Sequence, residues 1–167
     1  MNRKCPITTY YFVEGDCEEK LVRSLIDDFA YLASGRVKVL NTKQKKIGRS
    51  LLLDIKRNSR IVFIFDTDVD QYDFLIANIK AIKNLDSNPI ICLIPQNSNL
   101  EDELIRSCKI KQIKELTHSK SNRDFKRDFL KSTNTKSLLE QCSFEFDRIW
   151  TGSIPSQIKN HQVIRYL

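Results

Sequence analysis

The residues best suited to chemistry in this chain are carboxylates that directly follow an apolar run. Asp66 and Asp68 come after Ile61–Phe65, an unbroken β-branched and aromatic run that predicts a strand buried on both faces of a parallel sheet. Open α/β sheets bind their ligands at the carboxyl ends of such strands. A tight turn would let both carboxylates reach one ion, and ligand sets made only of oxygen suit Mg²⁺ or Mn²⁺ better than zinc.

Another carboxylate has the same relation to an earlier strand. Thr8–Val13 is aromatic and β-branched, and it ends in Glu14 and a glycine before an amphipathic helix begins. Glu14 would converge with Asp66 and Asp68 if the two strands are neighbours. Such a set suits metal-dependent phosphoryl transfer, because divalent ions neutralise the charge that grows on a phosphate and activate a water.

Other interpretations of the acidic segment exist. A calcium loop is excluded, because Gln71 stands where the sharp-turn glycine belongs and Ala77 where a bidentate glutamate is needed. A phosphatase of the haloacid dehalogenase class also has Asp-x-Asp after an apolar strand. That class usually has the motif on the first strand, with Thr or Val where this chain has Asp70. In the third interpretation the segment is a solvated turn, and in any case we expect Asp70 to be the N-cap of the following helix.

The order of the predicted elements defines the fold class. Helices alternate with four strands, which we expect at Thr8–Val13, Val37–Leu40, Ile61–Phe65 and Pro89–Ile94. This alternation predicts an α/β fold with a four-stranded, mostly parallel sheet, right-handed crossovers and helices on both faces. Gly35 is expected to end the first helix, and Phe74 is expected to face inward from a helix at Tyr72–Leu85.

The pattern changes after the fourth strand. Helical patterns begin at Leu100 and again over residues 120–142, and Gln162–Leu167 is a candidate edge strand. The chain shows no linker, repeat or low-complexity segment. We therefore expect its 167 residues to form a single domain, with a core at about 8–95 and a helical C-terminal elaboration at about 96–167.

Basic residues are in excess and gather in two stretches. The net charge is +7 and the pI is about 9.2. Patches of this kind are the electrostatic footprint of a phosphate-rich partner, which favours nucleic acid. The residues expected to contact its backbone are Lys43, Lys45, Lys46, Arg49, Arg123 and Lys126.

Cysteine usage and hydropathy bear on the compartment. The five cysteines are scattered without a CxxC pair, which argues for reduced thiols in a cytoplasm and against a disulfide framework or a zinc site. No apolar run is long enough to span a bilayer, and the N-terminus lacks the apolar core of a signal peptide. We therefore expect a cytoplasmic protein with no membrane association.

The two acidic motifs together resemble the Toprim signature. VEGD at 13–16 and FDTD at 65–68 look like its Glu-Gly after the first strand and its Asp-x-Asp after the third. Type IA topoisomerases, bacterial primases, a ribosomal RNA maturase and the OLD-family nucleases share this signature. The resemblance covers the predicted core and implies an α/β sheet that binds Mg²⁺ through Asp66 and Asp68. Glu14 is then a third acidic ligand or a general acid/base.

Chain length and the helical tail look closest to small RloB-like and OLD-like members, which are linked with defence against phage and other mobile elements. Glu18 is similar in placement to a second acidic residue of OLD-like members. By the same resemblance, the segment after the fourth strand nominates Glu101 and Asn99 for the site. No tyrosine matches a topoisomerase nucleophile, so DNA relaxation is not expected of this chain alone.

The function implied is that of a Mg²⁺-dependent nuclease that cleaves phosphodiester bonds in DNA or RNA. It would be the effector of a defence system with a separate sensor protein, such as an ATPase. Two alternatives stay open. One is a binding or scaffolding module of a nucleoprotein complex with a vestigial acidic site. The other is a dehalogenase-type phosphatase, which would form a phospho-aspartyl intermediate on Asp66 and tolerate the loss of Glu14.

Overall fold

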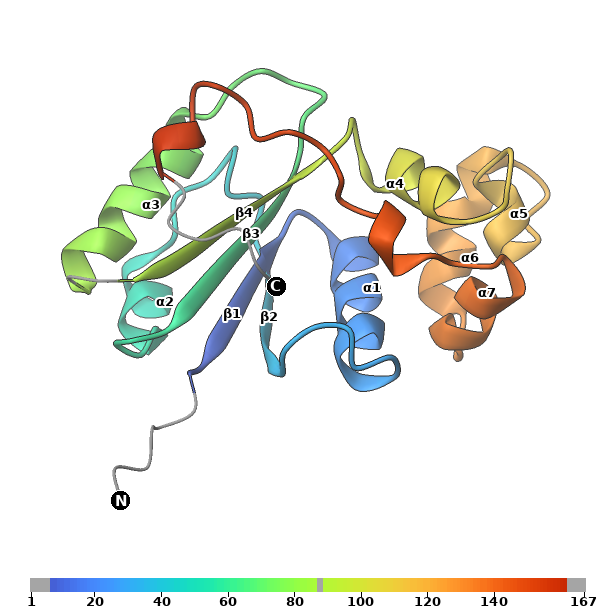
Figure 1. Cartoon of the computed structure of the whole chain (residues 1–167), viewed down its shortest axis with the longest axis horizontal. Helices are drawn as coiled ribbons and strands as arrows, with labels where there is room; N and C mark the ends of the chain where they lie inside the picture. The colour runs from blue at the N-terminus through green and yellow to red at the C-terminus, as the bar shows by residue number, and fades with distance from the viewer. Residues whose placement is uncertain (1–6, 87–88, 162–167) are drawn as a thin grey trace.

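Four parallel strands form one sheet in the order β2-β1-β3-β4 (Figure 1). The computed structural model describes residues 7–86 and 89–161. Helices cover both faces of the sheet, so the predicted α/β architecture is confirmed, with every described strand pair parallel. The strands are β1 (Thr9–Val13), β2 (Gly35–Val39), β3 (Arg60–Asp66) and β4 (Ile90–Gln96).

The strand order places a switch point at the centre of the sheet. From β1 the chain moves outward to β2, and from β2 it crosses back over β1 to pair β3 with the other side of β1. Right-handed crossovers in opposite directions lead to opposite faces, so the connections after β1 and β3 separate and leave a crevice at the carboxyl ends of these strands. The fold therefore favours a binding site between the ends of β1 and β3.

The helices divide into two groups that sandwich the sheet. Alternate side chains of β1 point to opposite faces of the sheet. Tyr11 and Val13 belong to one buried apolar cluster, and Tyr10 and Phe12 belong to the other. The first cluster is covered by α1 (Asp16–Asp27), α4 (Leu100–Ser107), α5 (Lys114–Thr117), α6 (Phe125–Lys131) and α7 (Thr135–Gln141). The second is covered by α2 (Arg49–Asp54) and α3 (Asp73–Leu85). The 3-10 turns are η1 (Asn122–Asp124), η2 (Phe146–Arg148) and η3 (Lys159–His161).

Gly35 does not end the first helix. That helix ends at Asp27, and Gly35 is instead the first residue of β2, paired with Thr9. A Cβ atom at Gly35 would lie 2.6 Å from the carbonyl oxygen of Thr9 and 2.8 Å from the ring of Tyr11. The glycine is needed because β1 and β2 approach closely, a reason that the helix pattern alone does not contain.

The beginning of α3 also differs from the prediction. The helix begins at Asp73 and is preceded by Tyr72, so Asp70 is not its N-cap. Tyr72 is buried against Phe65, and the helix begins directly after this buried ring. Phe74, predicted to face inward, is 37% exposed, because the buried stripe of α3 runs through Leu75, Asn78, Ile79 and Ile82.

A segment that we call the strap, residues 149–158, passes from one face of the sheet to the other across β4 (Figure 1). Ile149 is buried in the first cluster and Ile158 in the second. Between them, Gln157 Nε2 donates to both carboxylate oxygens of Asp70, at 2.9 and 2.8 Å. The strap thus ties the C-terminal part of the chain to the loop that follows β3.

The predicted edge strand at Gln162–Leu167 lies outside the described residues. In the described part of the chain, no helix is both long and apolar enough to cross a membrane.

Candidate functional site

Glu14 and Asp66 meet at the switch point, as the sequence predicts. Glu14 directly follows β1, and Asp66 is the last residue of the neighbouring strand β3. The Oε1 atom of Glu14 accepts a hydrogen bond from the backbone N–H of Asp66 at 3.1 Å, and its Oε2 atom accepts one from Asn41 Nδ2 at 2.9 Å. Both carboxylate oxygens of Glu14 are therefore held in place at the start of the acidic loop.

Lys43 fastens the acidic loop from the side of β2. Its ammonium group donates to the carbonyl oxygens of Asp66 and Val69, at 2.7 and 2.6 Å, and lies 5.0 Å from the centre of the Tyr72 ring. Lys43 is only 7% exposed. The sequence nominates it as a surface contact for phosphate, but the structure places it beneath the loop, where it shapes the backbone.

Thr67 fastens the same loop from the side of β4. Its hydroxyl donates to the carbonyl oxygen of Gln96 at 2.7 Å and accepts from the backbone N–H of Ser98 at 3.1 Å. Its own N–H donates to the carbonyl oxygen of Ser98 at 3.1 Å. The middle residue of the Asp-x-Asp motif thus links the acidic loop to the segment at the end of β4.

Gln96 is a site residue that sequence reasoning missed. It ends β4, pairs in register with Asp66, and is fully buried. Its Nε2 atom donates to Asp66 Oδ1 at 2.7 Å, and its amide acts to lower the pKa of the neighbouring Glu18 against the effect of burial. The available signal was a polar residue at the carboxyl end of an otherwise apolar strand, which is the feature that identified Glu14 and Asp66.

The negative charges of the carboxylates in the site are only partly neutralised by the surrounding protein. The pKa of Asp66 is raised from 3.8 to about 7, mainly by burial and then by the negative charges of Glu14, Glu18 and Asp68, against the hydrogen bond from Gln96. The pKa values of Glu14 and Glu18 are also raised, in each case mainly by burial. For Glu14, the N–H of Asp66 and the charge of Lys43 act in the opposite direction. The group therefore holds more negative charge than the protein neutralises, which favours a cation or a proton there.

A cavity of about 270 Å³ opens in front of these residues. Glu14, Asp66 and Asp68 line it, together with residues of the loops at 41–44 and 69–71. Asp68 is exposed and makes no hydrogen bond or ion pair with the part of the chain that is described, so its side chain is free to turn. The cavity thus has fixed carboxylates on its wall and an adjustable one at its mouth.

The carboxylates of the site are ligands of the type that a hard divalent ion prefers, but their side chains are not positioned around a common point. Among residues 7–86 and 89–161, no three Asp, Glu, His or Cys side chains are placed as they stand to hold a metal ion. Carboxylates with raised pKa values nevertheless repel one another, and a cation would relieve that repulsion. Mg²⁺ retains several waters and needs only one or two protein carboxylates, a demand that Asp66 and Asp68 can meet.

Glu18 and Glu101 lie on the α1 side of the site. Glu18 acts electrostatically on Glu14 and Asp66, which places it in the same acidic group. Glu101 forms an ion pair with Lys126 at 3.1 Å, and both residues interact with Glu18. Glu101 is thus a neighbour of the site whose charge is already paired with a lysine.

Asn99 and Glu103 have structural positions. The Oδ1 atom of Asn99 accepts from the N–H of Asp102 at 3.0 Å, so Asn99 caps α4. Glu103, in the acidic first turn of this helix, is fully buried. Its carboxylate accepts from the N–H groups of Asn97 and Trp150 and pairs with Arg106 at 2.7 Å.

The remaining basic candidates lie on the surface. Lys45, Lys46 and Arg49 are exposed at the end of the loop that carries Asn41 and Lys43, and Arg123 and Lys126 are exposed on the C-terminal helices. The loop is fixed by Asn78 of α3, which accepts from the N–H of Ile47 and donates to the carbonyl oxygens of Thr42 and Lys45. Because the loop is fixed, the side chains of Lys45 and Lys46 are held on the surface next to the cavity.

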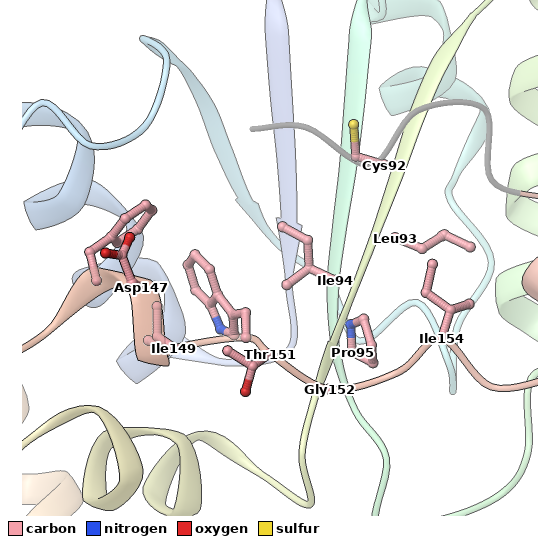
Figure 2. A pocket seen from close by; sticks show the side chains of 11 residues that line it. Cys92, Leu93, Ile94, Pro95, Asp147, Ile149, Thr151, Gly152 and Ile154 are labelled. Carbon is pink, nitrogen blue, oxygen red and sulfur yellow. The ribbon is translucent and has the colours of Figure 1, made fainter.

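A second cavity, shown in Figure 2, has a different character. It encloses about 350 Å³ between β4 and the strap, and its lining is mostly apolar, including Leu93, Ile94, Ile149 and Ile154. None of the five acidic residues nominated by the sequence lines it. The chemistry suggested by the carboxylates therefore belongs to the smaller, polar cavity.

Comparisons with family models, curated proteins and solved structures found no match for this chain. The resemblance to Toprim proteins thus stays a prediction, based on the type, order and structural setting of the two motifs, and the α/β architecture is consistent with it.

Proposed function

We propose that this protein is a Mg²⁺-dependent nuclease that hydrolyses phosphodiester bonds in DNA or RNA. The observation that supports the proposal best is the direct contact between Glu14 and Asp66 at the switch point of the sheet. Two carboxylates that arrive from neighbouring strands, with raised pKa values and a polar cavity before them, are the arrangement expected of a site for metal-assisted phosphoryl transfer.

The proposal assigns Mg²⁺ or Mn²⁺ to Asp66 and Asp68, with Glu14 completing the site and Glu18 and Glu101 contributing charge from α1 and α4. The ion, when bound, would supply neutralisation of phosphate charge and activation of water. Glu14 is oriented by Asn41 and by the backbone of Asp66, and its raised pKa suits it to accept or hold a proton at Oε1 or Oε2.

The substrate backbone would pass over the basic side of the cavity. Lys45, Lys46 and Arg49 extend from the loop that forms the cavity wall, so they can contact phosphates next to the one being cleaved. Arg123 and Lys126 would contact the backbone on the other side, next to Glu101. The resemblance to OLD-like and RloB-like proteins extends the proposal to a cytoplasmic effector of anti-phage or mobile-element defence that acts with a sensor protein.

The test is a cleavage assay with labelled plasmid, single-stranded DNA and transfer RNA, in Mg²⁺, Mn²⁺ or EDTA. We expect metal-dependent cutting of at least one substrate by the wild type, and a loss of at least a hundredfold in Glu14→Ala and in Asp66→Ala/Asp68→Ala. Asp73→Ala is the matched control. It removes a nearby exposed carboxylate that does not line the cavity and whose side chain makes no hydrogen bond or ion pair with the described residues, so cutting should be unchanged.

Cutting by the double variant at the wild-type rate would contradict the proposal. The alternative of a non-catalytic binding module is favoured by one observation, that no three metal-binding side chains are yet brought together in the described residues. It predicts nucleic-acid binding without cleavage and no Mg²⁺-dependent rise in melting temperature. A functional site would show such a rise, because a ligand that binds only the folded state stabilises it.

A further inference from the structure

We propose that Gln96 is the positioning residue of the acidic site, which sets the oxygen of Asp66 that is presented to the metal ion. The inference rests on the proposed metal site and deepens it. It comes from a side chain that neither acidic motif contains and that lies on a third strand, β4.

The position of Gln96 is closely determined. It is 0% exposed and pairs in register with Asp66 across the β3–β4 ladder. Its carbonyl oxygen accepts from the hydroxyl of Thr67 at 2.7 Å, so its backbone is tied to the acidic loop as well. From this fixed backbone, Nε2 donates to Asp66 Oδ1 at 2.7 Å.

This hydrogen bond distinguishes the two oxygens of Asp66. Oδ1 is occupied by the amide, while Oδ2 has no hydrogen-bond partner in the part of the chain that is described. Oδ2 is therefore the oxygen available to a cation. Carboxylate ligands of metal ions are commonly oriented by such hydrogen bonds to their other oxygen.

The chemical type of the residue supports this role. An amide can donate to Asp66 without adding positive charge, so the negative potential that attracts a divalent ion is preserved. A lysine at this position would neutralise the carboxylates itself and would compete with the metal. An apolar residue would leave buried carboxylate oxygens without a donor, which is costly.

The other end of the amide is an independent observation. Gln96 Oε1 is buried and has no hydrogen-bond partner in the described part of the chain, although buried acceptors are normally paired. It adjoins the acidic group, so a donor brought there with the ion would pair it. Mg²⁺ usually retains several of its waters in proteins, and these waters are donors.

The experiment compares Gln96→Met, which keeps the length of the side chain but removes the donor, with Gln112→Met as the matched control. Gln112 is exposed, does not line the cavity, and its side chain makes no hydrogen bond with the described residues. The dissociation constant of Mg²⁺ is measured from the metal-dependent melting temperature, and that of Mn²⁺ by electron paramagnetic resonance. We expect Gln96→Met to weaken binding by roughly 10- to 100-fold and Gln112→Met to leave it unchanged.

A role in stability alone gives a different result. Gln96→Met would then lower the melting temperature of the metal-free protein without changing either dissociation constant, and the inference would be overturned. Should this variant not fold, the wild type still gives an answer. The side-chain amide resonances of Gln96 should shift on adding Mg²⁺ with the same dissociation constant as the melting temperature, and unchanged resonances would overturn the inference.

The two proposals fail in distinguishable ways. If the wild type binds neither Mg²⁺ nor Mn²⁺, the proposed function falls and the role of Gln96 falls with it. If the wild type binds metal and Gln96→Met binds it equally well, only the role of Gln96 is wrong.

Discussion

The side-chain ammonium group of Lys43 donates a hydrogen bond to the backbone carbonyl oxygen of Asp66, 23 residues further along the chain, at 2.7 Å. A second bond from the same ammonium reaches Val69. The loop after β2 therefore holds the acidic loop after β3, and the cation that does so is buried and uses its charge inside the protein. The other lysines of the segment are exposed.

The first prediction concerns this lysine. Lys43→Met removes two charge-assisted hydrogen bonds and leaves two carbonyl oxygens without them, so we expect the free energy of unfolding to fall by about 1.5–3 kcal/mol. Urea denaturation monitored by circular dichroism measures it. Lys45→Met, on the exposed part of the same loop, should change it by less than about 0.5 kcal/mol. Equal effects of the two substitutions would show that the bonds of Lys43 do not hold the loop.

The second prediction is a pH dependence. The pKa of Asp66 is raised from 3.8 to about 7 in the folded protein, mainly by burial. Between these values the folded chain holds a proton that the unfolded chain has released, so this residue makes stability fall as pH rises from about 4 to about 7. Asp66→Asn cannot titrate, and its urea midpoint should depend less on pH over that window. Identical pH profiles for wild type and variant would contradict the shift.

A third prediction concerns the buried carboxylate of α4. Glu103→Ala removes the acceptor for the N–H groups of Asn97 and Trp150 and leaves Arg106 without its partner. Breaking a buried ion pair from one side is strongly destabilising, and we expect a loss of about 3 kcal/mol in unfolding free energy. Asp102→Ala, on the exposed side of the same helix, should cost less than about 1 kcal/mol. A comparable loss in both variants would contradict the role given to Glu103.

The fourth prediction tests the basic loop as a binding surface for phosphate. Nucleic-acid binding by the triple variant Lys45→Gln/Lys46→Gln/Arg49→Gln should show a shallower dependence of log K on log salt, with a slope smaller by roughly 1 for each phosphate that is no longer neutralised. The matched control, Lys109→Gln/Lys111→Gln/Lys120→Gln, removes the same charge from exposed positions around α5, beyond α1 and away from the loop (Figure 1). Equal slopes in the two triple variants would mean that the loop acts only through net charge.

The parts of the fold that follow from local pattern were predictable. Ile61–Phe65 and the apolar run that became β4 are continuous, a pattern typical of strands buried in a parallel sheet. The meeting of Glu14 with Asp66 followed from the same logic, because each residue ends a strand and the two strands are adjacent.

The parts that depend on the packing of loops were not predictable. Nothing in the segment around Lys43 distinguishes the one buried lysine from its exposed neighbours, since its partners are carbonyl oxygens of a distant loop. Asp70 was expected to be an N-cap, but α3 begins only after Tyr72, whose ring is buried against Phe65 of the neighbouring strand. Gln96 carried a usable signal, but its role required the knowledge that β4 lies next to β3.

The position of Ile158 has a consequence for the order of folding. Its side chain is fully buried in the cluster that also contains Ile47 and residues of α3, near the C-terminal end of the described chain. Chains emerge from the ribosome from the N-terminus onward. The strands that carry Glu14 and Asp66 can therefore form during synthesis, whereas the cluster beneath the basic loop closes only after Ile158 has been made. In a nascent chain, the strands that carry the acidic residues would therefore form early, and the apolar cluster that packs beneath the basic loop would be completed last.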